Sequence, residues 1–116
     1  MDSIVNTIKK SLGIESSDDS FDSDIILNIN TAIFSLSQMG VGPSNGYIVT
    51  SIDEKWIDYI NTTTINLEGI KTVIYLKTKL LFDPPTNITV IESIKKTITE
   101  LEWRLSLAVE TNNLEV

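Results

Sequence analysis

The sequence predicts an all-α fold: a small bundle of four to five helices with one long glycine-rich loop and a long C-terminal helix. Two observations support this fold class. Apolar residues recur at steps of three and four along most of the chain, which is the spacing of one helix face. The main interruption is segment 40–52, which gathers glycine, proline and asparagine. With 116 residues, the chain has the length of a single domain, 1–116.

Apolar spacing predicts the first two helices. From Ile4 to Leu12 apolar residues recur four positions apart, and Gly13 is a natural helix terminator. After the polar stretch IESSDDSFDSD, a second helix is expected from about Ser23 to Met39, ended by Gly40. Its buried face is a stripe formed by Ile25, Ile26, Ile29, Ile33 and Leu36.

Segment 40–52 is expected to form a protruding loop, because it holds three glycines and a proline in its first seven residues. The tyrosine and β-branched residues at 47–50 favour a short extended segment within it. A loop of this length in a small domain is either mobile or functional. Its turn dipeptides are Gly42-Pro43 and Asn45-Gly46.

A short helix is expected in SIDEKWIDYI, capped by Ser51 or Asp53 and ended by the run NTTT. The fourth helix, roughly Leu67 to Phe82, is apolar on two sides, which is typical of a central helix with neighbours on both. The expected buried residues of the short helix are Trp56, Ile57 and Ile60.

The stretch LLFDPP at residues 80–85 predicts a stiff corner formed by Asp83, Pro84 and Pro85. Proline has no amide hydrogen and pushes the preceding residue out of the α region, so the fourth helix must stop at about Phe82. Because Pro85 also constrains Pro84, the corner fixes the direction in which the next helix leaves.

The last helix is expected to begin near Asn87, or a turn later if Thr89 and Glu92 form a capping box, and to continue to about Glu110. At about 24 residues it would be ~36 Å long, which approaches the diameter of such a domain. Part of it is therefore expected to project beyond the core. The polar tail, residues 111–116, is expected to be disordered.

Composition weighs against an enzyme. The chain has no cysteine and no histidine, which removes thiolate nucleophiles, the commonest general base and the commonest metal ligand. No cofactor and no metal site are expected. The stretch GVGPSNG lacks the glycine spacing of a phosphate-binding loop, and the acidic stretch at 18–24 lacks the ligand spacing of an EF-hand.

The balance of charge limits the partners. With 9 basic against 16 acidic residues the net charge is −7, and such a surface repels phosphate backbones, so sequence-specific nucleic-acid binding is not expected. The pairs Lys9-Lys10 and Lys95-Lys96 are interpreted as solvated helix faces. Because no signal peptide and no membrane span are predicted, we expect a soluble protein kept inside a cell or packaged into an assembly formed there.

The stretch ELEWRL at residues 100–105 leaves two alternatives open. Glu100 and Arg104 stand four positions apart and are expected to form an exposed pair on the helix surface. Trp103 lies on a different face from the apolar stripe of this helix. It either packs within the subunit, against Trp56 or the fourth helix, or forms part of an interface together with Arg104.

Four stretches, taken in order, resemble a known family: GVGPSNGYIVTS, KWIDYI, IKTVIYLKTKLLFDPP and ITELEWRL. This succession, over roughly residues 22–107, is similar to small head–tail connector (adaptor) proteins of tailed bacteriophages. The resemblance implies a helical subunit of a twelve-fold ring that attaches below the portal and continues the DNA channel towards the tail. It also implies synthesis in the host cytoplasm and a final place in the virion, at the head–tail interface.

The resemblance implies partners and candidate sites as well. The partners are further copies of the chain, the portal protein and the next head-closure or tail component. The C-terminal segment is expected to face the portal through Trp103, Arg104, Leu107 and Glu110. The loop is expected to face the channel or a neighbouring component through Gly42, Pro43, Asn45, Gly46 and Tyr47.

An acidic ring would repel the DNA that it encloses and let it pass. A stiff corner at 83–85 would hold the angle between the two longest helices at every repeated contact. Two alternatives to the ring subunit are kept. One is a small acidic regulatory or inhibitor protein that binds a partner one-to-one. The other is a head-completion or tail-terminator role, although tail terminators usually carry more β structure.

Overall fold

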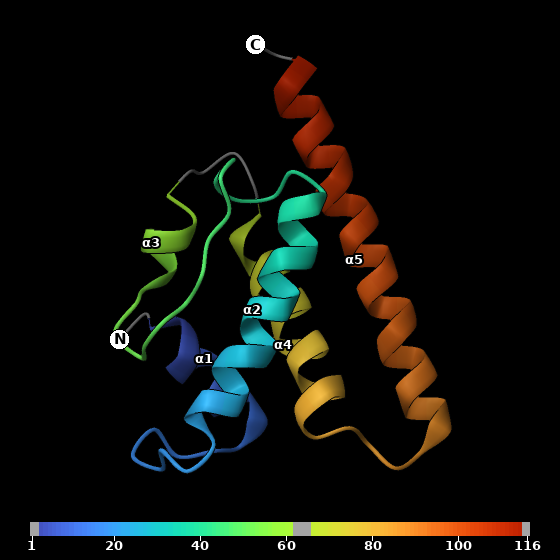
Figure 1. Ribbon diagram of the computed structural model, residues 1–116. Coiled ribbons are helices and arrows are strands. Elements are labelled where there is room, and N and C mark those ends of the chain that lie inside the picture. The colour runs from blue at the N-terminus through green and yellow to red at the C-terminus, as the bar shows by residue number, and fades with distance from the viewer. Residues whose placement is uncertain (1–2, 62–65, 115–116) are drawn as a thin grey trace.

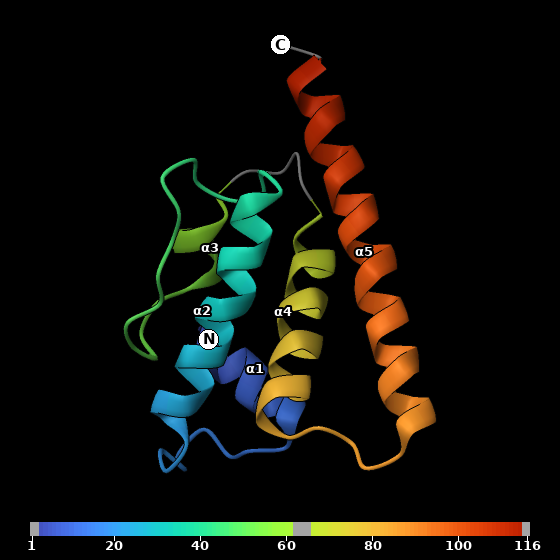
Figure 2. The ribbon, with the colours of Figure 1, turned by 45° about the vertical axis from the view of Figure 1, so that its right-hand side comes forward.

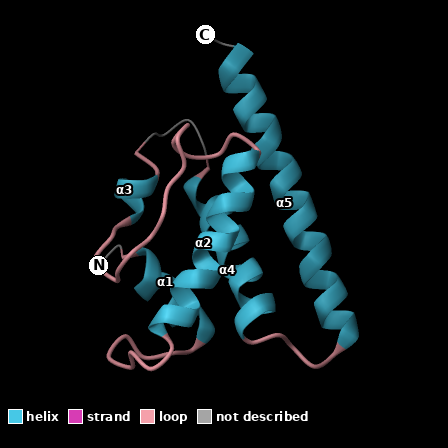
Figure 3. Cartoon of the chain, in the orientation of Figure 1, coloured by secondary structure: helices cyan, strands magenta, loops and turns pink. Residues whose placement is uncertain are grey.

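The computed structural model describes residues 3–61 and 66–114, with side chains up to Glu110. The described residues form five helices and no strand (Figure 1, Figure 3). Within these residues, an isolated antiparallel β-bridge joins Ser3 and Lys55. The prediction of an all-α bundle is confirmed. The helices are α1 (Ile4–Leu12), α2 (Asp22–Gln38), α3 (Trp56–Tyr59), α4 (Leu67–Phe82) and α5 (Ile88–Leu114).

Helix α4 is the central element. Helices α1 and α2 pack against it from one side and α5 packs from the other (Figure 2). Each fully buried aliphatic side chain contributes about 1.5–3 kcal/mol to the free energy of unfolding, so this helix carries much of the core. The predicted bounds and the predicted central position are both confirmed. Its buried residues are Ile70, Val73, Ile74 and Thr78.

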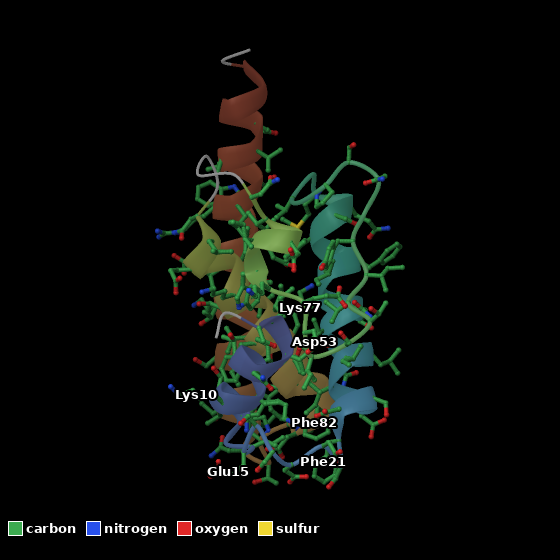
Figure 4. The ribbon with its side chains drawn as sticks, turned by 90° about the vertical axis from the view of Figure 1, so that its left-hand side faces the viewer. Lys10, Glu15, Phe21, Asp53, Lys77 and Phe82 are labelled. Atoms are coloured by element: carbon green, nitrogen blue, oxygen red, sulfur yellow. The ribbon has the colours of Figure 1, made fainter. Side chains whose placement is uncertain are left out.

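Helix α1 ends at Gly13 as the sequence predicted, but one of its lysines is not solvated. Gly13 ends the helix in the left-handed conformation, with φ at 82°. The side chain of Lys9 is fully buried, and its Nζ lies 2.8 Å from Asp22 Oδ1 and 3.1 Å from the Ser16 carbonyl oxygen. The interpretation of Lys9 as a solvated residue was therefore wrong, because the first turn of α2 supplies a carboxylate next to it. Its neighbour Lys10 is exposed (Figure 4).

Helix α2 ends at Gln38, and Gly40 follows with φ at 86°, close to the predicted end. The inward stripe of this helix is buried as predicted, apart from the half-buried Ile26. At the other end of α2, Phe21 packs edge-on against Phe82 with ring centroids 5.5 Å apart (Figure 4). This contact ties the start of α2 to the last turn of α4.

Helix α3 is a single turn, and two predictions about it were wrong. Its N-cap is Lys55, not Ser51 or Asp53, and the Asp58 carboxylate closes the turn by accepting from the Lys55 amide at 2.8 Å. Ile57 is 65% exposed, whereas Tyr59 is buried in its place. The turn is too short to repeat a helical period, so the apolar pattern misassigned its faces. The predicted break at 61–64 falls mostly outside the described residues.

The corner after α4 forms where the prolines predicted it. Asp83 leaves the α region, with φ at −146° and ψ at 68°, and α5 then runs back along α4 (Figure 1). Asn87 caps α5 by accepting from the amides of Thr89 and Val90, so the alternative start at a Thr89–Glu92 capping box was wrong. Lys77 on α4 binds Glu102 on α5 at 2.7 Å and holds the two helices together.

Helix α5 has 27 residues, about 40 Å at 1.5 Å per residue, and its end stands above α2 and α4, as predicted (Figure 2). It continues past Glu110 to Leu114. The proposed disorder of the tail stays a prediction, and residues 115–116 lie outside the described part of the chain.

We predict that Lys9→Ala lowers the free energy of unfolding by about 3 kcal/mol, because it leaves the Asp22 carboxylate without its cation and opens a cavity under α2. Urea denaturation at neutral pH measures this. The matched control is Lys10→Ala, an exposed change on the same helix, which should stay within about 0.5 kcal/mol of the parent. Equal losses in the two variants would contradict the structural role of the ion pair.

Candidate assembly surfaces

The outer face of α5 exposes large apolar residues. Trp103, Leu107 and Glu110 recur at steps of four and three, which places them on one face of the helix. Trp103 is 61% exposed and Leu107 is exposed beside it, so the subunit does not bury this tryptophan. The alternative in which this tryptophan is buried within the subunit was wrong. We call this surface the α5 stripe; it comprises Trp103, Arg104, Leu107 and Glu110.

An ion pair lies next to the apolar part of the α5 stripe. Arg104 Nη2 lies 2.9 Å from Glu100 Oε1, and both side chains are largely exposed, as the spacing predicted. An exposed pair of this kind adds only a few tenths of a kcal/mol to helix stability. A tryptophan next to an arginine is a composition enriched among the residues that dominate protein–protein binding.

The glycine-rich loop is fastened to α2 by one side chain. The Val49 amide donates to Asn30 Oδ1 at 2.8 Å, and Asn30 Nδ2 donates to the Val49 carbonyl oxygen at 2.9 Å. The amide side chain thus satisfies both backbone groups of Val49, as a neighbouring strand would. This clamp explains why segment 47–50 needs no strand partner. No sequence signal marked Asn30, since its partner lies 19 residues away.

A second network of hydrogen bonds, centred on Glu54, fixes the C-terminal part of the loop. The Glu54 carboxylate accepts four hydrogen bonds, from the Tyr47 hydroxyl, the Ser51 amide, and the amide and hydroxyl of Thr50, at 2.6 to 3.0 Å. Burial works to raise the pKa of Glu54, but these hydrogen bonds outweigh it and lower the pKa. Burial, and then the bond to Glu54, raises the pKa of Tyr47 well above its ordinary value.

Two glycines of this region touch other elements. Gly42 has φ at 98°, and a Cβ there would lie 2.9 Å from Cε1 of Tyr59, whose ring also packs 5.2 Å from that of Tyr47. Gly40 meets α5, because a Cβ on it would lie 3.1 Å from Cγ1 of Val109. Of the loop residues predicted as a contact surface, Gly42 and Tyr47 therefore face partly inwards, while Asn45 is exposed.

The outer face of α2 and the loop enclose a groove that the sequence analysis did not identify. Its apolar residues are largely exposed: 65% for Leu27, 63% for Phe34 and 69% for Ile48. Leu27 and Phe34 stand seven positions apart on the side of α2 opposite to its buried stripe. This spacing is the sequence pattern from which the exposed apolar face of α2 could have been predicted. We call these three residues the groove patch.

The corner residues lie at the surface, at the end of the molecule opposite to the tip of α5 (Figure 1). Asp83 and Pro84 are exposed and Pro85 is half-buried. Lys79 Nζ lies 3.2 Å from Asp83 Oδ2, which adds an ion pair across the last turn of α4. The segment that follows exposes two apolar side chains, Ile88 at 73% and Val90 at 44% accessible.

Within residues 3–61 and 66–114, no group of three or more acidic side chains is placed to hold a metal ion. In the same part of the chain, no helix has both the length and the hydropathy needed to cross a bilayer. The α5 stripe, the groove patch and the exposed segment after the corner are the surfaces with large exposed apolar residues that are considered below.

Comparison with known families decides the identity. A family model described as phage connector protein matches residues 4–112. The chain belongs to this family. The match confirms the resemblance to head–tail connector proteins, and the connector chain is accordingly a structural component of the phage particle. No curated protein and no solved structure matches it.

Two glycine substitutions test how tightly the connector loop is packed. Gly46→Ala meets open space and should cost about 1–2 kcal/mol for its φ of 84° alone. Gly42→Ala has a similar φ and also presses on the Tyr59 ring, so it should cost about 1–3 kcal/mol more. Thermal and urea unfolding of both variants provide the comparison. If the two losses were the same, Tyr59 would not hold this part of the loop.

Glu54→Gln should lower the free energy of unfolding at pH 7 by about 1–2 kcal/mol, because it weakens charge-assisted hydrogen bonds to the loop. The pKa of Glu54 is lower in the folded than in the unfolded state, where it is near 4.5. Its contribution is therefore present above pH 4.5 and is lost as the pH falls through the folded-state pKa.

Urea denaturation at pH 7 and at pH 3 checks this expectation. The difference between the parent and Glu54→Gln should shrink on acidification. The control is Asp53→Asn, a change at the exposed neighbouring carboxylate, which should have little effect at pH 7. A difference that stays constant between the two pH values would rule out a role for the Glu54 charge.

Proposed function

We propose that the chain is the subunit of a head–tail connector ring of twelve copies. The ring binds the portal protein and continues the DNA channel towards the tail, where it meets the next head-closure or tail component. Membership of the phage connector family supports this proposal. The virion is then the site of function, and the host cytoplasm is the site of synthesis.

The α5 stripe is the observation that carries the proposal. A single subunit leaves Trp103 61% exposed on a helix whose end stands clear of the bundle (Figure 2). Exposed tryptophan and leucine beside an arginine favour a protein-binding surface over a solvated helix face. We therefore assign Trp103, Arg104, Leu107 and Glu110 to the contact with the portal.

The net charge of −7 fits the proposed channel. Carboxylates repel the phosphate backbone, so a ring of acidic subunits guides DNA without holding it. In this proposal the loop, with the exposed Asn45 between the half-buried Pro43 and Gly46, faces the channel or a neighbouring component.

Native mass spectrometry over a wide range of concentrations tests the ring. A species near 155 kDa, twelve times the 12.9 kDa of the chain, is the expected result. A monomer at every concentration would contradict a self-assembling ring. A stable one-to-one complex with a cellular protein would instead favour a small acidic regulator or inhibitor.

Trp103→Ala should weaken binding to the portal protein of the same phage by about 30-fold, the loss typical of truncating a central interface residue. Because Trp103 is exposed in the subunit, the free energy of unfolding should change by less than about 0.5 kcal/mol. Surface plasmon resonance gives the affinity, with Lys96→Ala on the same helix as the control. Unchanged affinity for Trp103→Ala would remove the α5 stripe from the portal contact.

A further inference from the structure

We infer that adjacent connector subunits meet through two uncharged apolar surfaces, with the corner of one copy lying in the α2–loop groove of the next. This inference rests on the proposed ring and names the surfaces that build it. The first surface is the groove patch, defined above as Leu27, Phe34 and Ile48. The second is the corner patch, which we define as residues 84–91.

The groove is apolar and carries no charge along its walls. Besides the groove patch, it is lined only by small polar, amide and tyrosine side chains and glycine, including Asn30, Thr31 and Asn45. In a chain with 22% charged residues, a lining without any charged side chain is a marked departure from the rest of the surface. A patch of this kind on an otherwise polar surface indicates a protein contact.

The corner patch shares this property. Residues 84–91 read PPTNITVI and contain no charged residue, although Asp83 precedes them and Glu92 follows. Ile88 is the most exposed of the large apolar side chains in the described part of the chain, at 73%, and Val90 is also exposed. Ile88 is the side chain that the groove patch would bury, since Val90 stands two positions further along α5 and points to another side of the helix.

Charge identifies the occupant of the groove as a second copy of the chain. Two copies each carry −7 and repel each other, so their contact is least costly where both surfaces lack charge. Two other exposed apolar residues, Ile57 and Trp103, differ in this respect. Ile57 lies between the exposed charged residues Lys55 and Asp58, and Trp103 lies beside Arg104, which suits a partner of different composition.

The two patches lie on different sides of the subunit, as a ring requires. In Figure 1 and Figure 2 the corner lies at the lower right and the glycine-rich loop lies at the left, beyond α2. A contact between two different surfaces repeats head to tail, and it closes into a ring when the rotation between copies divides a full turn. A contact of either patch with itself would stop at a dimer.

Both patches are held in place before any contact forms. The clamp between Asn30 and Val49 and the hydrogen bonds to Glu54 fix the loop wall of the groove. The two prolines and the Asn87 cap fix the start of α5 and therefore the position of Ile88. Surfaces that are already ordered lose less conformational entropy on binding.

Engineered cysteines test the inference directly, because the natural chain has none. Phe34→Cys and Ile88→Cys are made as separate proteins, one of them labelled with ¹⁵N, and are mixed in equal amounts under mild oxidation. Intact-mass analysis then distinguishes mixed from self-paired disulfides. The Phe34–Ile88 pair is expected to exceed either self-pair at least tenfold. The matched control replaces Ile88→Cys with Ile57→Cys, a similarly exposed isoleucine.

A second pair of variants tests the head-to-tail direction. Phe34→Asp blocks the groove and Ile88→Asp blocks the corner, and both sites are exposed, so circular dichroism should show an unchanged fold. Neither variant alone should assemble. In the mixture, the intact corner of the Phe34→Asp variant can still bind the intact groove of the Ile88→Asp variant. The mixture should therefore form dimers with one copy of each variant and nothing larger.

The outcomes separate this inference from the proposed function. If the parent forms a ring while the Phe34–Ile88 disulfide is no more abundant than the control, the inference is wrong and the ring stands. A predominance of Phe34–Phe34 disulfides would also overturn it, since it indicates a symmetric contact. A parent that stays monomeric and gives no selective disulfide would overturn the inference and the self-assembling ring, whereas binding of the monomer to the portal protein would still support the connector function.

Discussion

Helix α4 is buried on two sides because α2 and α5 pack against it from different directions, and the surfaces described above follow from that arrangement. The apolar inward faces of α2 and α5 both pack into the core around α4. Their outer faces, with Phe34 on one and Trp103 on the other, are left to solvent. The Lys77–Glu102 ion pair and the corner at 83–87 keep α5 in register with α4. A single subunit thus presents two separate apolar faces, and neither can be buried without another molecule.

The elements that depend on local chemistry could be predicted from the sequence. Two prolines stop a helix in any context, so the end of α4 at Phe82 needed no knowledge of the fold. The left-handed conformation of Gly13 and the central place of α4 followed in the same way from a glycine terminator and from apolar residues on two helix faces. For the candidate site, the exposure of the Glu100–Arg104 pair was predictable because its spacing satisfies the pair within one helix.

Features that depend on partners far away in the chain could not be predicted in this way. Lys9 is buried because α2 brings the Asp22 carboxylate next to it. The residues that neighbour Lys9 in the sequence give no indication of this contact. Asn30 takes the place of a neighbouring strand for Val49, and helical spacing carries no information about this contact. Ile57 belongs to a helix of one turn, in which apolar periodicity has no room to distinguish the two faces. In each case a tertiary contact overrides the local pattern.

The close approach of Gly40 to Val109 links the loop to the upper half of α5. A partner that shifts this half of α5 must press on, or release, the start of the loop, and a neighbour that shifts the loop must act on α5 in return. Thermodynamic reciprocity requires the two effects to be equal in free energy. Whichever partner binds first therefore changes the affinity for the second by the same factor, so the occupancy of one surface affects the other in either order of binding.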